Sequence, residues 1–370
     1  MKNNDLVLLD MIFGLVLLPL SLTIRALRRF LSKIFRLNYE GILIIKFLGA
    51  GNLIAIKKSI NEKSTDILSA KSNSSAIAKF NIGNQIFLLD DSSFLRLIFS
   101  GIICTFRIVF KNYEQVINLE TESKFAKFII TLTSTKVLSG VSNIHKSYID
   151  LYIYDKYLVN PLMLNKPEII DLLLNFKKIK NKNLEYSLNE HRKNFLLNNN
   201  LNDVKKIVIS PAGSNTDTIR RLSVDYGWNT IINFLNSLEG VESIDIVFSS
   251  SSDQQYLDFQ SLTKKYHLLK IHITTYDEFV EKIQESDLLF TIDSQALHIG
   301  QFFSKLSIAI YGPSTPFGVN FENTTYPISQ SLICSPCRHK YLRLPCGGKA
   351  PCMDFDDNHF EILKFINCKT

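Results

Sequence analysis

Outside its first 40 residues, the chain has no dense basic stripe with interleaved aromatic side chains. Its formal net charge is +7, and residues 1–40 supply three of these charges, with six cations and three anions. Proteins that bind nucleic acid rely on clustered Lys and Arg to neutralise phosphates. Nucleic-acid binding is therefore not expected, whereas the mild positive excess suits phosphates, nucleotide sugars or acidic lipids.

The chain also lacks internal repeats and low-complexity segments, which argues against a repeat array. Of its 370 residues, 46% are hydrophobic and 21% are charged, a composition typical of a globular protein. This length is sufficient for two domains, each with its own core.

The amino terminus has no small-residue cleavage site before its basic cluster, so a cleaved signal peptide is not expected. Residues 6–24 are mostly apolar but are interrupted by Asp10, Gly14 and Pro19. A spanning helix needs ~20 apolar residues, so this segment either crosses a bilayer or lies on its surface. Residues 25–36 mix Arg and Lys with apolar side chains, a pattern typical of a membrane surface. We predict a membrane-associating helix in residues 1–40, with the rest of the chain in the cytoplasm; the alternative is a helix buried against a domain.

The second half of the chain alternates predicted strands with predicted helices, which indicates a doubly wound parallel sheet. The predicted strands are Lys205–Ser210, Ser243–Phe248, Leu269–Thr274, Leu288–Ile292 and Leu306–Ile310, and the helices are centred on Trp228–Leu238, Gln254–Tyr266 and Tyr276–Glu285.

The first half begins with a continuous apolar strand, Gly41–Leu48, which leads into a glycine-rich turn and a helix over Leu53–Ile60. Weaker alternation predicts further strands at Gln85–Leu89, Ile102–Phe110 and Phe128–Leu132, with Leu151–Tyr154 closing this half. We therefore divide the chain into a helix (1–40), an amino-terminal α/β domain (41–175), a Lys- and Asn-rich linker with one short helix (176–204), a carboxyl-terminal α/β domain (205–330) and a cysteine-rich loop with a terminal helix (331–370).

The most informative segment is Asp287–Pro316. Its first apolar run ends in Asp293-Ser294, a helix then carries His298, and a second apolar run ends in Tyr311-Gly312-Pro313. Open α/β sheets bind ligands outside the carboxyl ends of their strands, and a helix amino terminus there favours anions. The segment therefore predicts a phosphate-binding corner; Asp293 also fits the position of a helix N-cap, which is compatible with that role.

This segment resembles the carboxyl-terminal signature of glycosyltransferase family 9, the lipopolysaccharide heptosyltransferases and their relatives. The shared pattern is D-[ST]-x-x-x-H followed by [YF]-G-P-[ST]-x-P, over about thirty residues. The chain departs from it at Gln295, where the family usually has a small residue close to phosphate.

Two more motifs extend the resemblance. Ile209–Asn215, followed by Arg220-Arg221-Leu222, is similar to the family's strand-N-P-G-[AS]-S…K-R-W-P segment, with Leu222 in place of Trp. Lys46–Asn52 is similar to the family's K-x-x-[GS]-x-G-D turn, with Asn52 in place of the Asp that is the proposed general base.

The resemblance implies a GT-B fold, in which two Rossmann-like domains enclose a ligand cleft, and a membrane-associated inverting glycosyltransferase. Such an enzyme would move a sugar, with heptose as one candidate, from a nucleotide-diphosphate donor to a cell-envelope glycan or glycolipid at the cytoplasmic face of a bacterial inner membrane. The donor would bind Ser214, Asn215, Arg220, Asp293, Ser294 and His298, and the acceptor would lie near Gly49, Gly51 and Asn52.

The mechanism that the resemblance implies is incomplete at Asn52, because a neutral amide cannot accept the proton of an acceptor hydroxyl. Another carboxylate or the donor's own phosphate would then serve as base, or the chain is catalytically poor. No D-x-D pair stands at a strand end of the donor half, so no divalent metal is required for catalysis. Two other functions remain open: a nucleotide-sugar-binding or scaffold relative, and a GT-B-like epimerase or hydrolase acting on the nucleotide sugar itself.

Four of the six cysteines follow the spacing Cys334-x2-Cys337-x8-Cys346-x5-Cys352. A C-x2-C pair with two later cysteines suits tetrahedral zinc, so we predict that these four could hold a structural zinc ion. Many family 9 members carry a similar cysteine segment after the G-P-[ST] motif. The alternatives are reduced cysteines or two disulfides, and a cytoplasmic location disfavours disulfides.

Overall fold

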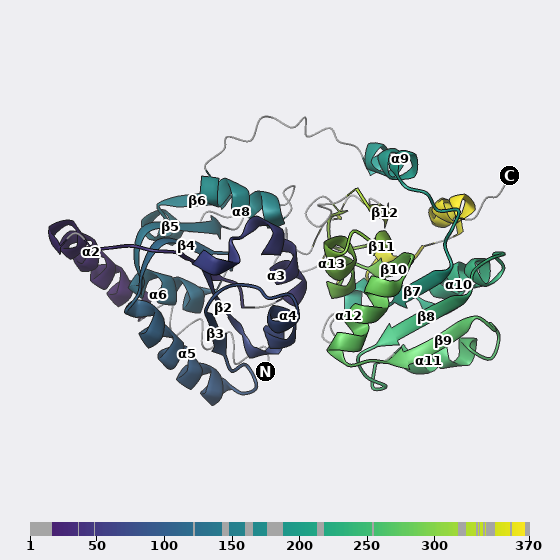
Figure 1. The fold of residues 1–370 in the computed structure, drawn as a ribbon, viewed down its shortest axis with the longest axis horizontal. Coiled ribbons are helices and arrows are strands. Elements are labelled where there is room, and N and C mark those ends of the chain that lie inside the picture. The colour runs from purple at the N-terminus through teal and green to yellow at the C-terminus, as the bar shows by residue number, and fades with distance from the viewer. Residues whose placement is uncertain are drawn as a thin grey trace. The chain divides into compact units, whose positions relative to one another are not determined.

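The computed structural model of the protein describes residues 17–35, 37–47, 49–120, 123–142, 148–159, 166–175, 188–212, 218–253, 255–316, 323–330, 332, 334–335, 337, 345–355 and 357–366. The chain forms two compact units (Figure 1). Unit 1 comprises Met1–Pro161 and Pro167–Lys178, and unit 2 comprises Leu162–Lys166 and Ile179–Thr370. Each unit has one six-stranded sheet in which all neighbouring strands are parallel.

The sheet of unit 1 has the strand order β3-β2-β1-β4-β5-β6. Its strands are β1 (Ile42–Ile45), β2 (Thr65–Ala70), β3 (Ile86–Leu89), β4 (Asn112–Asn118), β5 (Ser134–Ser142) and β6 (Lys156–Val159). The helices of this half are α2 (Leu18–Phe35), α3 (Ala50–Ile56), α4 (Ser74–Lys79), α5 (Phe94–Val109), α6 (Lys124–Leu132), α7 (Tyr148–Ile153) and α8 (Lys166–Asn175). Helices α2, α5 and α6 share one hydrophobic core with the sheet and lie on the same side of it (Figure 1).

The sheet of unit 2 has the order β12-β11-β10-β7-β8-β9. Its strands are β7 (Lys206–Ser210), β8 (Ser243–Phe248), β9 (Leu269–Ile273), β10 (Leu288–Ile292), β11 (Leu306–Tyr311) and β12 (Thr325–Ser329). Its helices are α9 (Leu188–Asn198), α10 (Asn229–Asn236), α11 (Tyr256–Leu262), α12 (Tyr276–Glu285) and α13 (Gln295–Phe302), and the 3-10 segment Asp357–Phe365 lies near the carboxyl terminus.

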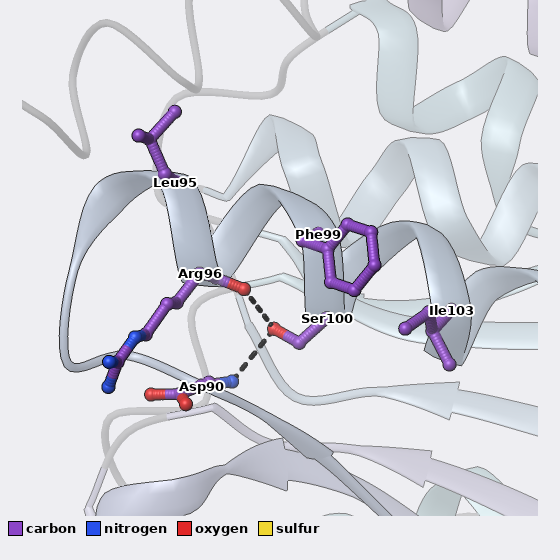
Figure 2. Close-up of a pocket in the computed structure, with 6 residues that line it drawn as sticks. All are labelled: Asp90, Leu95, Arg96, Phe99, Ser100 and Ile103. Carbon is purple, nitrogen blue, oxygen red and sulfur yellow. Dashed lines mark hydrogen bonds between the residues drawn. The ribbon is translucent and has the colours of Figure 1, made fainter.

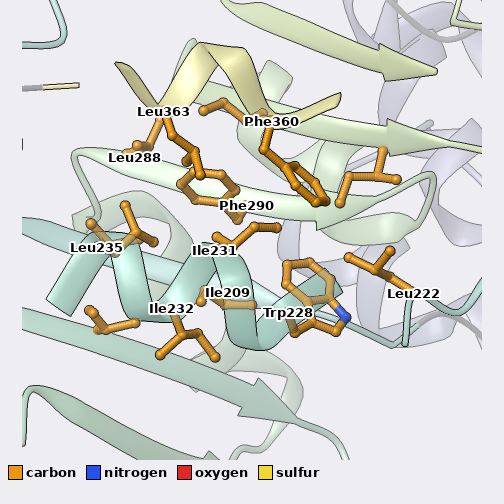
Figure 3. Packing of buried hydrophobic residues seen from close by; sticks show 14 of the residues in the cluster. Ile209, Leu222, Trp228, Ile231, Ile232, Leu235, Leu288, Phe290, Phe360 and Leu363 are labelled. Carbon is orange, nitrogen blue, oxygen red and sulfur yellow. The ribbon is translucent and has the colours of Figure 1, made fainter. Parts of the chain in front are cut away.

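The core of unit 2 is formed where α10 and the terminal 3-10 segment meet the sheet (Figure 3). Trp228, just before α10, is fully buried, and so are Ile231 and Phe290. Phe360 and Leu363 of the terminal segment belong to the same cluster. The carboxyl-terminal residues are therefore an integral part of this unit.

The predicted alternation of strands and helices in the second half is confirmed, with β8, β10 and α12 at their predicted bounds. Three predictions in the first half are wrong. Ile102–Phe110 lies in and just after α5, Phe128–Leu132 lies in α6, and Leu151–Tyr154 lies at the end of α7. Helix α5 is apolar on its inner face and on its outer face, and its polar residues Arg96, Ser100 and Arg107 form only a narrow stripe between them, so the helical period is weak in its sequence.

Besides Leu18 in the hydrophobic core, helix α2 uses polar side chains to contact the rest of unit 1. The Ser21 and Thr131 hydroxyl oxygens are 2.5 Å apart, and Arg25 donates to the Ile153 carbonyl and, at 3.2 Å, to Asp155. Burial lowers the pKa of Arg25 to about 10. Among the residues that the structure describes, no helix is both long and apolar enough to cross a bilayer. Residues 6–16 of the predicted membrane segment lie outside the described residues, so membrane association stays a prediction.

Candidate functional site

The strand order of unit 2 creates a topological switch between β7 and β10. From β7 the chain moves outward through β8 and β9, and it then returns to β10 on the other side of β7. In open α/β sheets, ligands bind outside the carboxyl ends of the strands at such a switch. The residues that follow β7 and β10 therefore occupy the expected ligand position.

An ion pair joins these two strand ends. Arg220, in a 3-10 turn (Thr218–Arg220) after β7, donates through Nη1 to the Asp293 carboxylate at 3.2 Å and to its backbone oxygen at 2.5 Å. Both side chains are partly buried, with exposed fractions of 17% and 13%. The structure thus brings together two of the predicted site residues from positions 73 apart in sequence.

The prediction that Asp293 caps α13 is wrong, because the N-cap residue is Ser294. Ser294 makes no side-chain capping bond, and its hydroxyl lies 3.0 Å from that of Thr291. No side chain of the N-cap residue therefore occupies the amino terminus of α13, which suits an anion. His298, in the same helix, is buried.

Arg221, the neighbour of Arg220, has a different environment. It forms two hydrogen bonds to the Asp253 carboxylate, at 2.9 and 3.0 Å, and both side chains are almost completely buried. Gln255 Nε2 donates to the Leu222 carbonyl beside them, at 2.7 Å. Arg221 is thus used to hold the segment after β7, which leaves Arg220 as the better candidate for a ligand contact.

The turn after β11 completes this edge of the sheet. Tyr311 is fully buried, and burial together with the Asp293 charge raises its pKa far above 10, so its phenol stays neutral. Ser314 is 4% exposed, and its hydroxyl has no hydrogen-bond partner among the described residues. A buried hydroxyl without a partner is unfavourable, so a ligand oxygen would be a suitable partner for it.

The cysteine segment lies on the same turn. Ser335 Oγ donates to the Gly312 carbonyl at 2.5 Å, and Cys337 N donates to the Pro313 carbonyl at 3.1 Å. A Cβ at Gly312 would lie 2.3 Å from Met353 Sδ and 3.1 Å from Cys352 Sγ, so only glycine allows this close approach.

The four cysteines of this segment are free thiols, so the alternative of two disulfides is not found. Burial and the charges of neighbouring thiols raise the pKa of Cys337, and they raise that of Cys352 to about 11. Within the described part of the chain, no group of three or more His, Cys, Asp or Glu residues is arranged to hold a metal ion. The zinc site at Cys334, Cys337, Cys346 and Cys352 therefore stays a prediction.

Unit 1 has the same kind of switch, between β1 and β4. Gly49, the N-cap of α3, has a φ of +89°, a conformation that favours glycine. Asn52 N donates to the Gly49 carbonyl at 2.9 Å, and a Cβ at Gly49 would lie 2.8 Å from Asn52 Nδ2. Gly51 is buried and Asn52 is half-buried, so Asn52 stands at the carboxyl edge of this sheet.

Sequence reasoning missed a carboxylate at this edge. Glu120, just after β4, accepts hydrogen bonds from Lys46 Nζ and from the Phe47 N–H, both at 2.8 Å. The Asn118 side chain donates to the Tyr154 hydroxyl oxygen, at 2.7 Å, beside it. The polar residues at the end of Asn112–Asn118 could have indicated a site after this segment. The sequence pattern did not show that the segment is the strand β4, so Glu120 could not be placed at the edge of the sheet.

The structure leaves part of the predicted donor site open. Ser214 and Asn215 lie outside the described residues. Arg220, Asp293 and Ser294 gather at the carboxyl edge of unit 2, and His298 lies one helical turn further along α13. Gln295, the departure from the family pattern, donates to the Tyr276 hydroxyl oxygen at 2.7 Å and so links α13 to α12.

No protein-family model and no curated protein sequence matches the chain. Solved structures do match it. The E. coli heptosyltransferase WaaC with ADP is 13% identical, with a TM-score of 0.57 over 77% of this chain and 92% of that one. The E. coli ADP-heptose lipopolysaccharide heptosyltransferase II is 15% identical, with a TM-score of 0.54 over 88% and 97% of the two chains.

A glycosyltransferase family 9 protein from Veillonella parvula is 14% identical, with a TM-score of 0.55 over 79% of this chain and 86% of that one. At this level of identity the likeness is one of fold. The chain therefore has the predicted α/β fold, with two doubly wound units like those of the GT-B heptosyltransferases.

Proposed function

We propose that the chain is an inverting glycosyltransferase that moves a sugar from a nucleotide-diphosphate donor to a glycan or glycolipid of the bacterial cell envelope. The observation that carries this proposal is the Arg220–Asp293 pair at the switch point of unit 2. The proposal is supported by the fold, which resembles that of WaaC solved with ADP and with ADP-2-deoxy-2-fluoro heptose. Heptose is therefore the first donor sugar to test.

In this proposal Arg220 binds the donor diphosphate, because a guanidinium can donate two parallel hydrogen bonds to phosphate oxygens. Asp293 would act mainly by orienting Arg220, since its own negative charge would repel the diphosphate. Ser214, Asn215, Ser294 and His298 would complete the donor site. When the bond between sugar and diphosphate breaks, Arg220 and the amino terminus of α13 would stabilise the departing charge.

The acceptor hydroxyl would attack the anomeric carbon while the carbon–oxygen bond to the diphosphate breaks, and its proton must pass to a base. Asn52 can orient the hydroxyl by a hydrogen bond but cannot accept this proton. Glu120 is the carboxylate held at the same edge of unit 1, through Lys46. Glu120 and the departing diphosphate are thus the two groups to test as base.

The proposal places the protein at the cytoplasmic face of a bacterial inner membrane, attached through its apolar amino terminus. It requires no divalent metal for transfer.

The structural zinc is a separate proposal, which elemental analysis of the purified full chain tests. One zinc per chain, lost in a Cys346→Ser variant, would mean that the four thiols rearrange to bind it; no zinc would leave them as reduced cysteines.

The proposed donor site is tested by isothermal titration calorimetry of the full chain with ADP-heptose and then with common UDP and GDP sugars. We expect one donor to bind, and Arg220→Ala to weaken its binding by about 10- to 100-fold, as for the loss of a charge-assisted hydrogen bond. Lys205→Ala is the matched control, because Lys205 forms an exposed ion pair with Glu242 before β7 and β8 begin. If no nucleotide sugar binds the folded chain, the proposal is wrong.

A second candidate is a protein that binds the donor without turnover, which Asn52 motivates. A transfer assay with and without acceptor extract separates the candidates, because a transferase needs the acceptor. A binding protein gives no product in either case, and an epimerase or hydrolase gives product without acceptor.

A further inference from the structure

Helix α5 presents large apolar side chains to solvent along its whole length. The exposed residues are Leu95, Phe99, Ile102, Ile103 and Phe106, followed by Phe110 just after the helix. Five of the six are more than 60% exposed, among them Phe99 at 69% and Phe110 at 71%. The opposite face, with Leu97, Cys104 and Ile108, is buried against the sheet. The outer face thus contributes nothing to the core.

Helix α2 adds to the same side of the unit. Its exposed apolar residues are Leu20, Leu27, Phe30, Leu31, Ile34 and Phe35, with Leu37 after its end. Arg28 donates to the Leu132 carbonyl at the end of α6 and, at 3.5 Å, to the Val109 carbonyl at the end of α5. This arginine ties α2 to the ends of both helices.

We call these exposed residues of α2 and α5 the α2–α5 surface. Among the described residues of unit 1, they are all the large exposed apolar side chains except Tyr152, whose carbonyl lies 3.4 Å from Arg25 Nη1 of α2. In unit 2 the exposed apolar residues are scattered over separate elements. Large exposed apolar side chains gathered on two helices that Arg28 ties to the same neighbour mark a site of contact with a protein or a membrane.

The charges carried by the helices on this side of unit 1 are of one sign. Helices α2, α5 and α6 together contain eight Lys or Arg residues and no Asp or Glu. Arg96, Arg107 and Lys124 are exposed, and so is Arg29, which pairs with Asp155. Long cationic side chains beside apolar ones can place their charges at the level of lipid headgroups.

The amino-terminal end of α5 also borders an open hollow of about 420 Å³ (Figure 2). Leu95, Phe99 and Ile103 line it, and Ser100 bonds there to the Asp90 N–H and the Arg96 carbonyl, at 2.8 and 2.7 Å. The Asp90 carboxylate lies 3.6 Å from Lys71 Nζ, which offsets its charge. The hollow therefore adds a mainly apolar recess to the surface.

We infer that the α2–α5 surface is the face on which unit 1 lies against an anionic lipid bilayer, with both helices parallel to the membrane. A bilayer fits because its headgroups complement the cations and its acyl chains accept the apolar residues. A second copy of this chain fits less well, because the three helices carry cations and no carboxylate, so an isologous contact would bring the exposed Arg96, Arg107 and Lys124 of one copy near the same cations of the other.

The chain path supports the same occupant. The apolar residues 6–17, proposed to contact the membrane, lead directly into α2 at Leu18. The inference rests on the proposed membrane location but not on the proposed reaction. It extends the membrane contact from the amino terminus to α5, a helix that follows 76 residues after α2 begins.

The test uses the full chain with Phe99→Trp or Phe106→Trp and vesicles of phosphatidylglycerol and phosphatidylcholine whose acyl chains carry bromine. The one native tryptophan, Trp228, is fully buried and gives a constant background. We expect the bromine to quench the added emission at positions 99 and 106. Leu257→Trp is the matched control, because Leu257 is 69% exposed on α11 of unit 2, and we expect no quenching there.

A second measurement is vesicle sedimentation of a Phe99→Ser, Phe106→Ser double variant. We expect its partition onto the anionic vesicles to fall about tenfold, and binding to fall with added salt or on pure phosphatidylcholine. Leu257→Ser should bind as the unchanged protein does.

Three results would overturn the inference. The first is that the chain sediments with vesicles while the tryptophans at positions 99 and 106 stay unquenched, which would leave only the amino terminus on the membrane. The second is that the chain binds no vesicle, which would also contradict the proposed membrane location but would leave the donor-binding test unaffected. The third is that sedimentation velocity shows a dimer of the unchanged protein and a monomer of the double variant, which would assign the surface to a second copy.

Discussion

Two adjacent arginines, Arg220 and Arg221, illustrate how burial separates structural from functional residues. Arg221 is 8% exposed and is doubly hydrogen-bonded to Asp253, which is 5% exposed. Arg220 is more accessible and bonds to Asp293 through one nitrogen. From the sequence, either arginine could bind a diphosphate, and only the structure distinguishes them.

We therefore predict that Arg221→Met lowers the free energy of unfolding by about 3–5 kcal/mol, because it leaves the buried Asp253 without its partner. Arg220→Met should lower it much less but should reduce donor binding. Urea denaturation of both variants measures the difference. Equal destabilisation by the two changes would contradict the assignment of Arg220 to the ligand.

Asn52 is the residue that limits the proposed chemistry of unit 1. If Asn52→Asp supplies a general base, we predict that turnover rises by about 100-fold while donor affinity stays unchanged. Asn61→Asp is the control, because Asn61 is an exposed N-cap on another turn of the same unit. Steady-state kinetics with the identified donor measure the effect. Unchanged turnover would mean that the base is elsewhere, and Glu120→Gln would then be the next variant.

At the scale of the elements, the sequence predicted unit 2 well because its strands are apolar and its helices have a polar face. Helix α12, with its Thr275–Glu278 capping box, begins and ends as predicted. In unit 1, the pattern of Ile102–Phe110 predicts a strand in place of the second half of α5, because the outer face of this helix is apolar too. This outer face is the proposed membrane surface, so the failed prediction and the inferred function have one cause.

Strand β4 was missed for a related reason. Its polar residues are satisfied by partners distant in sequence, such as the Gln115 side chain, which donates to Ser139 at 2.8 Å and to the Leu173 carbonyl at 2.7 Å. Local composition cannot reveal such partners. Without β4, the position of Glu120 beside β1 could not be predicted, although the glycine turn and the Asp293 corner could.

Helix α9 is held to β12 by a histidine, which makes its attachment sensitive to pH. His191 Nε2 donates to the Thr325 carbonyl at 3.0 Å, and burial lowers the pKa of His191 below 6.5, although this hydrogen bond opposes the shift. Because the folded pKa is the lower one, the unfolded chain binds more protons between the two values. The stability that the neutral His191 side chain contributes is complete above pH 6.5 and is lost as the pH falls through the folded pKa.

We predict that the Tm falls between pH 7 and pH 5, and that it falls less in His191→Gln, whose amide can still donate to the Thr325 carbonyl. Thermal unfolding followed by circular dichroism at both pH values measures this. The neighbouring Arg192 donates to the Pro327 carbonyl at 2.9 Å and so also ties α9 to β12. Identical pH dependence in the two proteins would contradict a role for His191.

At the scale of the whole molecule, the two units share one design. In each, a cation that follows one strand in sequence pairs with a carboxylate that follows the neighbouring strand across the topological switch: Lys46 with Glu120 in unit 1, and Arg220 with Asp293 in unit 2. Each unit also has its own hydrophobic core. The proposed donor residues all belong to unit 2, whereas the proposed acceptor residues belong to unit 1.

Because each unit has a separate core, we predict that calorimetry of the full chain resolves two unfolding transitions. The donor nucleotide should raise the midpoint temperature of only one of them. A ligand at 100 times its Kd stabilises the unit that binds it by about 2.7 kcal/mol. Arg221→Met identifies that transition independently, since the Arg221–Asp253 pair lies in unit 2. The donor should therefore raise the same transition that Arg221→Met lowers. If the donor instead raised the other transition, the donor site would belong to unit 1, and the assignment of Arg220 and Asp293 to it would be wrong.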